Sequence, residues 1–89
     1  MLRYHVAFYL PHAPGEMVVA EALDFPGAMT QGFDLQDARL MIASALEDLA
    51  QLLLEEGKAL PVPSEDAQNP EADLIELVPL FIHAGTALK

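Results

Sequence analysis

The chain has 89 residues, of which 53% are hydrophobic, and its 14 acidic and 4 basic side chains give a formal net charge of −10. This composition predicts one small folded domain, and the absence of cysteine excludes a disulfide framework and a thiolate metal site. Nucleic-acid binding draws its affinity from lysine and arginine, so we expect no direct contact with nucleic acid or with an anionic membrane.

The N-terminal third has the alternation of apolar and polar residues that is typical of β-strands. It predicts a strand over residues 3–9, a turn with two prolines and a glycine over 10–15, and a returning strand over 16–22. Together these segments predict a hairpin. After a short loop at 24–27, we expect a third strand across 28–31.

The middle of the chain has the strongest pattern, because apolar residues recur there with the spacing of one helix face. Asp34 is a suitable N-cap, and Asp37, three positions later, completes an approximate capping box. Gly57 stands where a helix would end, so we expect a helix over residues 35–56. The predicted apolar stripe comprises Leu35, Ala38, Ile42, Ala45, Leu46, Leu49, Leu52 and Leu53.

Three further apolar residues of this helix, Leu40, Met41 and Leu54, lie off the main stripe. Apolar side chains on an otherwise polar helix flank indicate a second contact. We therefore expect these three residues to form an interface between subunits, which makes the protein a homo-oligomer.

Residues 58–72 contain three prolines and several acidic residues, which predicts an extended, irregular loop. The last element is an apolar strand over about 73–83, and Pro79 within it indicates a sheet edge or a bulge. The order β-β-β-α-β predicts an α+β two-layer sandwich, in which one long helix covers an antiparallel sheet. These elements form a single domain over residues 1–89.

The sequence does not show the pattern of a catalytic or metal site. The three histidines, His5, His12 and His83, lack the short spacing of metal ligands on one element. Neither Ser44 nor Ser64 stands on a strand-to-helix elbow with a glycine pair nearby. The five glycines are isolated, so no phosphate-binding loop is predicted. We expect a protein that is not an enzyme and that uses no cofactor and no metal.

The surplus of acid has two interpretations: it attracts a basic protein partner, or it only keeps a small protein soluble. Around the third strand, Asp24, Phe25 and Phe33 flank two glycine turns, which makes this segment a candidate contact surface. No apolar run is long enough for a membrane span or a secretory signal, so we expect a cytoplasmic protein.

Two segments at either end of the expected helix carry a family pattern. Residues 24–38 read DFPGAMTQGFDLQDA, and residues 55–64 read EEGKALPVPS. The first resembles the signature of HicB-type antitoxins, in which a Pro-Gly turn, a Thr and a Gly lead into a helix. The second resembles the family's closing Gly-x-x-Ile-Pro-x-Pro-Ser segment. The resemblance covers residues 3–83, although Asp34 and Asp37 replace the family's usual Thr and Glu.

This resemblance implies a β-β-β-α-β fold described as a degraded RNase H-like domain, in proteins that commonly form dimers or tetramers. It also implies a partner, HicA, which is a small basic toxin that cleaves mRNA. Many members carry a C-terminal DNA-binding domain with which they repress their own operon. Only six residues follow His83, so we expect no such domain in this chain.

Our leading hypothesis is a HicB-like antitoxin that neutralises a basic HicA-like toxin by occlusion and charge complementarity. Carboxylates would imitate RNA phosphates and aromatic rings would anchor the contact; the candidate residues are Glu21, Asp24, Phe25, Phe33 and Asp34. A second hypothesis is a stand-alone oligomeric module with no toxin partner. A third, a small hydrolase or nuclease, is disfavoured because residues 3–9 contain no acid.

Overall fold

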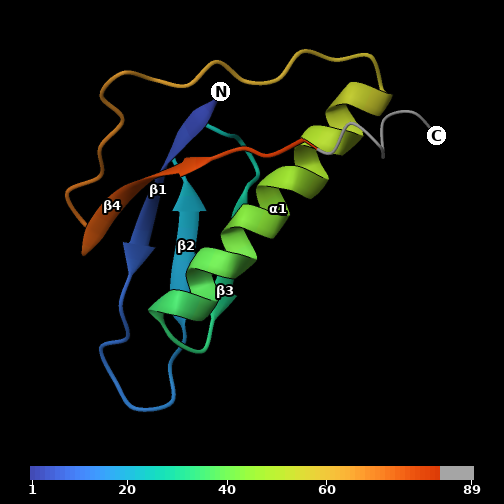
Figure 1. Cartoon of the computed structure of the whole chain (residues 1–89). Helices are drawn as coiled ribbons and strands as arrows, with labels where there is room; N and C mark the ends of the chain where they lie inside the picture. The colour runs from blue at the N-terminus through green and yellow to red at the C-terminus, as the bar shows by residue number, and fades with distance from the viewer. Residues whose placement is uncertain (83–89) are drawn as a thin grey trace.

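A computed structural model describes residues 1–82 as a four-stranded sheet with one helix (Figure 1). The elements in chain order are β1 (Arg3–Tyr9), β2 (Val18–Ala22), β3 (Met29–Gly32), α1 (Leu35–Glu55) and β4 (Leu74–Pro79). The strand order is β3-β2-β1-β4, and every neighbouring pair is antiparallel. The predicted α+β class and its two-layer arrangement are confirmed, whereas the likeness to RNase H stays a prediction.

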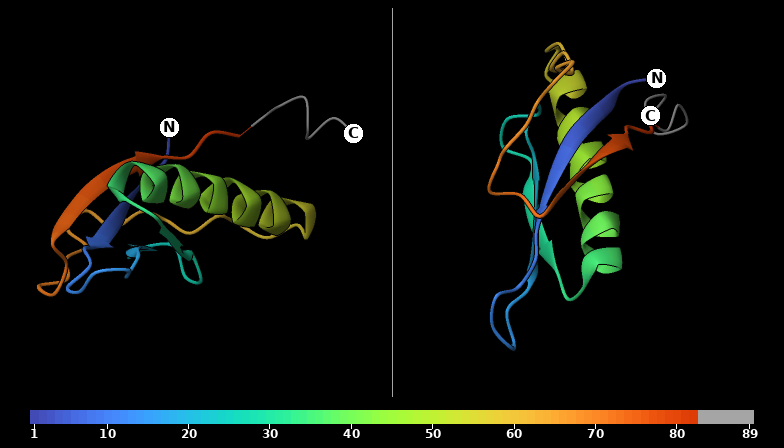
Figure 2. Two further views of the ribbon diagram at one scale, coloured as in Figure 1. Left: turned by 90° about the horizontal axis from the view of Figure 1, so that it is seen from below. Right: turned by 90° about the vertical axis from the view of Figure 1, so that its left-hand side faces the viewer.

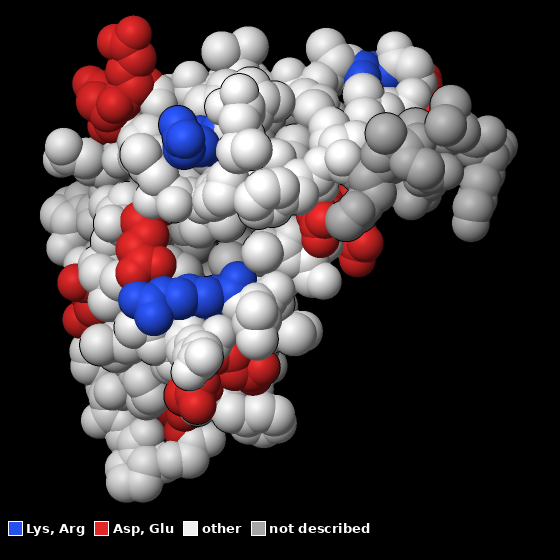
Figure 3. All heavy atoms as spheres, viewed as in Figure 1, with Lys and Arg blue, Asp and Glu red and all other residues white. Residues whose placement is uncertain are grey.

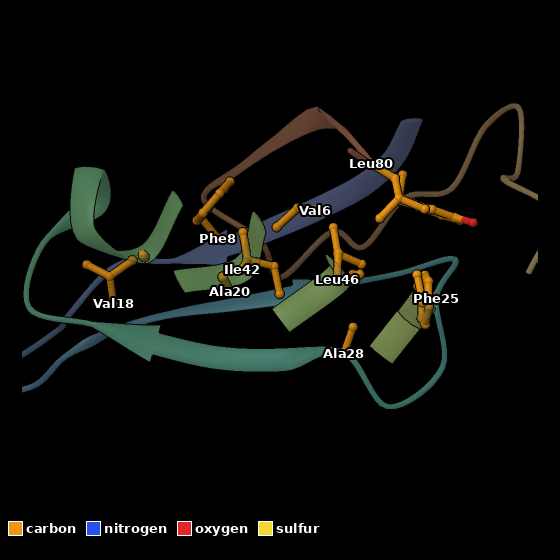
Figure 4. Packing of buried hydrophobic residues seen from close by; sticks show 13 residues of the cluster. Val6, Phe8, Val18, Ala20, Phe25, Ala28, Ile42, Leu46 and Leu80 are labelled. Carbon is orange, nitrogen blue, oxygen red and sulfur yellow. The ribbon is translucent and has the colours of Figure 1, made fainter. Parts of the chain in front are cut away.

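The core lies between α1 and the sheet face that it covers. Every second residue of β1 points into this space, so Tyr4, Val6 and Phe8 are all fully buried. Figure 4 shows Val6 and Phe8 of the sheet facing Ile42 and Leu46 of α1. Truncating a buried side chain of this size to alanine typically costs about 2–5 kcal/mol, so this layer supplies much of the stability.

The buried stripe of α1 is narrower than the sequence predicts. Ala38, Ile42, Leu46 and Ala50 are buried at a spacing of four residues, which places them in one row along the helix. Leu52 was predicted to belong to this stripe, and that prediction is wrong, because its side chain is 50% exposed. Each residue turns the helix by about 100°, and this rotation places Leu52 beyond the edge of the buried row.

Both ends of α1 have the caps that the sequence predicts. The Asp37 N–H donates to Asp34 Oδ1 at 2.7 Å, so Asp34 is the N-cap. At the other end Gly57 has a φ of +74°, and the Lys58 N–H donates to a carbonyl oxygen of the last turn at 2.8 Å. These two features define a Schellman motif. The helix ends at Glu55, one residue before the predicted end.

Residues 58–73 form a strap loop that crosses the sheet face opposite α1 (Figure 2). The Tyr4 hydroxyl donates to the Pro61 carbonyl oxygen at 2.7 Å, and Asn69 Nδ2 donates to the Tyr9 hydroxyl at 2.8 Å. The predicted irregular loop is therefore confirmed. Its function in the fold is to cover part of the second sheet face, which would otherwise be open to water.

The returning strand is also shorter than predicted, because the turn before it extends further. The Glu16 N–H donates to the Ala13 carbonyl oxygen at 3.3 Å, and Glu16 Oε1 accepts from the His12 N–H at 3.0 Å. These bonds hold Glu16 in the turn, so β2 begins at Val18 rather than at residue 16.

The last strand does not extend over the 73–83 predicted from the sequence. β4 ends at Pro79, and the Leu80 N–H then donates to the Leu2 carbonyl oxygen at 2.9 Å. β1 begins at Arg3, so this bond lies just beyond the paired residues of the two strands. The predicted length was wrong, and His83 lies outside the described residues. The predicted edge position of Pro79 is confirmed, because β4 is an edge strand.

Burial, and secondarily the negative charge of Asp24, raise the pKa of Tyr4 above its usual value of 10.0. A raised folded-state pKa stabilises the fold below pH 10, and this contribution is lost as the pH rises through the folded-state value. We expect Tyr4→Phe to lower the unfolding free energy at pH 7 by about 1 kcal/mol, because the bond to Pro61 is lost.

The difference between the wild type and Tyr4→Phe should shrink above pH 10, as measured by urea denaturation at several pH values. The pKa of Tyr9 is also raised, but Tyr9 is present in both proteins, so its titration does not contribute to the difference between them. A difference that stays constant up to the highest pH at which both fold would contradict this prediction.

Candidate partner-binding surface

The turn between β2 and β3 is shaped by Pro26 and Gly27. The Ala28 N–H donates to the Phe25 carbonyl oxygen at 3.1 Å, and Gly27 has a φ of +87°. Proline at the second position and a glycine with positive φ at the third are the features of a type II turn. The Ala22 N–H then donates to the Ala28 carbonyl oxygen at 2.9 Å, so the two strands pair directly after this turn.

The Asp24 carboxylate joins three separate segments of the chain. Oδ1 accepts from the His5 backbone N–H at 2.8 Å, while Oδ2 lies 2.9 Å from His5 Nδ1 and accepts from the Ser64 N–H at 3.0 Å. The Asp24 side chain is only 5% exposed. Its assignment as a contact group for a partner is therefore corrected, because its lone pairs already bind β1 and the strap loop.

Phe25 lies inside the core, although the sequence placed it among the exposed aromatic anchors. Its side chain is 1% exposed, and its ring packs edge-on against Tyr4 with centroids 5.0 Å apart. The turn that begins at Phe25 directs this side chain toward α1, as Figure 4 shows. The assignment of Phe25 to a contact surface is therefore wrong.

The other three predicted residues are accessible but do not form one patch. Phe33 is 85% exposed and, with Asp34, lies at the end of β3 that leads into α1. Glu21 lies in β2 on the sheet face opposite the helix, where it accepts a hydrogen bond from the Tyr9 hydroxyl at 2.8 Å. The turn with Asp24 is at the opposite end of β3.

The three apolar helix residues predicted as a subunit interface are all exposed, and Leu40 is 68% exposed. They are not neighbours on the helix surface. Leu40 and Leu54 are fourteen residues apart, which is about 21 Å along an α-helix. Met41 is turned from Leu40 by about 100°. Their function as one interface stays a prediction.

The residues that carry the family resemblance hold the backbone in place. A Cβ on Gly32 would lie 2.8 Å from the Cα of Ala38, so only glycine lets β3 pass so close to the first turn of α1. Gly57 ends the helix, and the Ser64 N–H donates to the Asp24 carboxylate.

The sequence alone placed Gly32 only at the end of a strand, and it did not predict the contact between His5, Asp24 and Ser64. These contacts join residues up to 40 positions apart, so no local spacing signals them.

Acidic side chains are distributed over the surface in several separate patches (Figure 3). One of them is neutralised locally: Arg39 Nε donates to Glu76 Oε1 at 2.9 Å, and this bond lowers the pKa of Glu76. The strap loop carries Glu65, Asp66 and Glu71, all exposed.

Within residues 1–82, no three side chains of His, Asp or Glu gather as metal ligands would. In the same range no helix has the length and apolar character needed to cross a membrane.

The described sheet and helix make this protein a small α+β domain, and its strap loop exposes acidic side chains. Comparison with models of known protein families gives no match, and no curated protein matches the sequence.

We expect Asp24→Ala to lower the unfolding free energy by about 2–3 kcal/mol, because it leaves buried N–H groups without an acceptor. Asp48→Ala is the matched control, since Asp48 is exposed on α1 and its loss should cost less than about 0.5 kcal/mol. Urea denaturation measures both. Equal losses in the two variants would show that the Asp24 contacts contribute nothing.

We expect Gly32→Ala to destabilise the fold by about 1–3 kcal/mol, because the added Cβ meets the backbone of Ala38. The control is Gln31→Ala, one residue earlier on the same strand, whose side chain is exposed. Thermal denaturation of the two variants should show a clear loss only for Gly32→Ala. A melting temperature of Gly32→Ala that equals that of the wild type would rule out this close approach.

Proposed function

We propose that this protein is a HicB-like antitoxin that binds a basic HicA-like toxin and masks its mRNA-cleaving surface. The support comes from the net charge of −10 and from the two HicB-like segments over residues 24–38 and 55–64. The protein performs no chemistry itself in this proposal and acts by occlusion. The cytoplasm, where mRNA is found, is its proposed location.

The observation that carries the proposal is the charge of the strap loop. The strap loop has four acids and one basic residue, Lys58, whose Nζ lies 3.1 Å from Glu56 Oε1 at the end of the helix. Glu65 and Asp66 are exposed, so their carboxylates are accessible to a partner, and Asp66 Oδ1 also accepts a hydrogen bond from the neighbouring Ser64 hydroxyl at 3.4 Å. A row of exposed carboxylates attracts the cationic surface with which an RNA-cleaving protein holds phosphates.

The contact surface changes from the one that the sequence suggested. Asp24 and Phe25 no longer belong to the proposed contact surface, because both side chains are buried and make contacts within the domain. Phe33 and Asp34 stay in the proposal, since they are accessible at the start of α1. An exposed phenylalanine at the rim of an acidic domain suits an anchor in a mixed polar and apolar contact.

The test measures binding to any small basic protein that is encoded beside this gene, by calorimetry and by stopped-flow association. The double variant Glu65→Gln/Asp66→Asn removes two charges from the strap loop, and Asp48→Asn/Glu55→Gln removes two from the outer face of α1. The strap-loop variant should associate several-fold more slowly at low salt, whereas the control should change much less, because electrostatic steering depends on where the charges lie.

Added salt should reduce the difference between the two double variants, since it screens exposed charges. Equal association rates for the two variants would exclude the strap loop as the contact. If no such neighbouring basic protein binds even at low salt, the antitoxin proposal is wrong.

A second candidate function is a stand-alone oligomeric module without a toxin. The exposed apolar residues of α1, Leu40, Met41 and Leu54, favour it. Light scattering on the purified chain tests this candidate: it requires an oligomer in the absence of any partner, and a protein that is strictly monomeric at high micromolar concentration excludes it.

A further inference from the structure

The outer edge of β3 carries unpaired backbone groups. The Ala22 N–H donates to the Ala28 carbonyl oxygen, and bonded pairs alternate along an antiparallel ladder. Thr30 therefore points its backbone groups toward β2, while Met29 and Gln31 point theirs away from the sheet. β3 is an edge strand, and among the described residues these groups have no acceptor or donor. This is the arrangement to which another strand adds.

The two edges of the sheet differ in their ability to accept a strand. On β4, the Leu80 N–H is bonded to Leu2, so by the same alternation Pro79 faces outward, where it offers no N–H to a further strand. β3 has no proline, and residues 25–33 contain no charged side chain. In a chain with a net charge of −10, this uncharged edge is where a second copy can approach with least repulsion.

One register of two antiparallel β3 strands uses all the outward-facing backbone N–H and C=O groups of Met29 and Gln31. In this register Met29 of one copy pairs with Gln31 of the other, and the two-fold axis passes through Thr30. The symmetry repeats the pair, which gives four backbone hydrogen bonds. A register with the two-fold axis at Gln31 would instead need the Phe33 N–H as a donor across the interface, and this N–H already donates to Asp37 at 2.8 Å. The register centred on Thr30 is therefore the better satisfied one.

This register also places an exposed ring over an empty depression. Phe33, 85% exposed, comes to lie opposite Gly27 of the second copy. Gly27 lines a pocket together with Leu23, Pro26 and Met29, and Glu21, whose carboxylate is bound by the Tyr9 hydroxyl, lies at the same pocket. Because the contact is two-fold symmetric, each copy supplies one ring and one pocket.

The flank of α1 on the β3 side of the sheet carries exposed apolar side chains. Arg39 binds Glu76 of β4, so the flank of α1 that carries Arg39 faces the β4 side of the sheet. Met41 and Leu52 lie about 200° and 220° further around the helix, which places them on the flank above β3. Both are exposed in the single chain, on the side from which the second copy would approach.

We propose that two copies of this chain join through antiparallel pairing of their β3 strands, with Phe33 of each copy seated on the pocket beside Gly27 of the other. The resulting dimer has one continuous eight-stranded sheet. This inference does not rest on the antitoxin proposal, since it needs no other protein. In the dimer Phe33 belongs to the contact between the two copies, so it would not be free to anchor a toxin, and the strap loop would carry that contact.

Light scattering on the purified chain should give a molar mass near twice 9.7 kDa at high micromolar concentration. Dimerisation should strengthen with salt, because the screening length falls from about 30 Å at 0.01 M to about 8 Å at 0.15 M and the two copies repel less. Phe33→Ala should raise the dissociation constant at least tenfold, and Gln31→Pro should give monomers. Ser44→Ala, at an exposed position on the outer face of α1, should leave the dissociation constant unchanged.

A second measurement does not depend on how well Gln31→Pro folds. The chain has no cysteine, so Thr30→Cys introduces a single thiol. Residues opposite each other in a non-bonded antiparallel pair have Cα atoms about 4.5 Å apart, which a disulfide can span. Mild oxidation should cross-link Thr30→Cys but not Gln31→Cys. A monomeric wild type at 0.15 M salt, the reverse cross-linking pattern, or a Phe33→Ala dimer as tight as the wild type would each overturn the proposal.

Discussion

The Asp24 carboxylate is the contact on which the rest of the structure depends. It stands where β2 ends, yet its oxygens bind the backbone and ring of His5 in β1 and the backbone of Ser64 in the strap loop. A carboxylate that is nearly inaccessible to water is stable only if its lone pairs are used. Asp24 therefore fixes the middle of the strap loop on the sheet, between the contacts of Pro61 with Tyr4 and of Asn69 with Tyr9, and part of the second sheet face is covered as a result.

Local patterns in the sequence predicted the elements well, because they depend on neighbouring residues. The alternation over β1, the caps at Asp34 and Gly57, and the helix bounds all follow from spacings of a few positions. The candidate surface was predicted less well. Asp24 and Phe25 look like exposed turn residues until the fold brings His5, Tyr4 and Ser64 to them. Contacts between distant segments have no periodic signal, so only the three-dimensional arrangement shows them.

The HicB-like segments can be understood physically without reference to a partner. Pro26 and Gly27 make the turn, Gly32 lets the helix approach, and Asp34 caps it. Each residue type is the one that its backbone position requires. Such a motif therefore describes how this domain folds. What the domain binds must be determined by residues that the motif leaves free, such as Phe33 and the acids of the strap loop.

Pro79 has a consequence that reaches beyond a single chain. A sheet with two open edges can add strands from both sides, and identical subunits then polymerise without limit. The proline that faces outward on β4 removes one hydrogen-bond donor from that edge, which disfavours strand addition on that side. An assembly built through the opposite edge is then favoured to close after one pairing, so the missing donor works against unlimited growth.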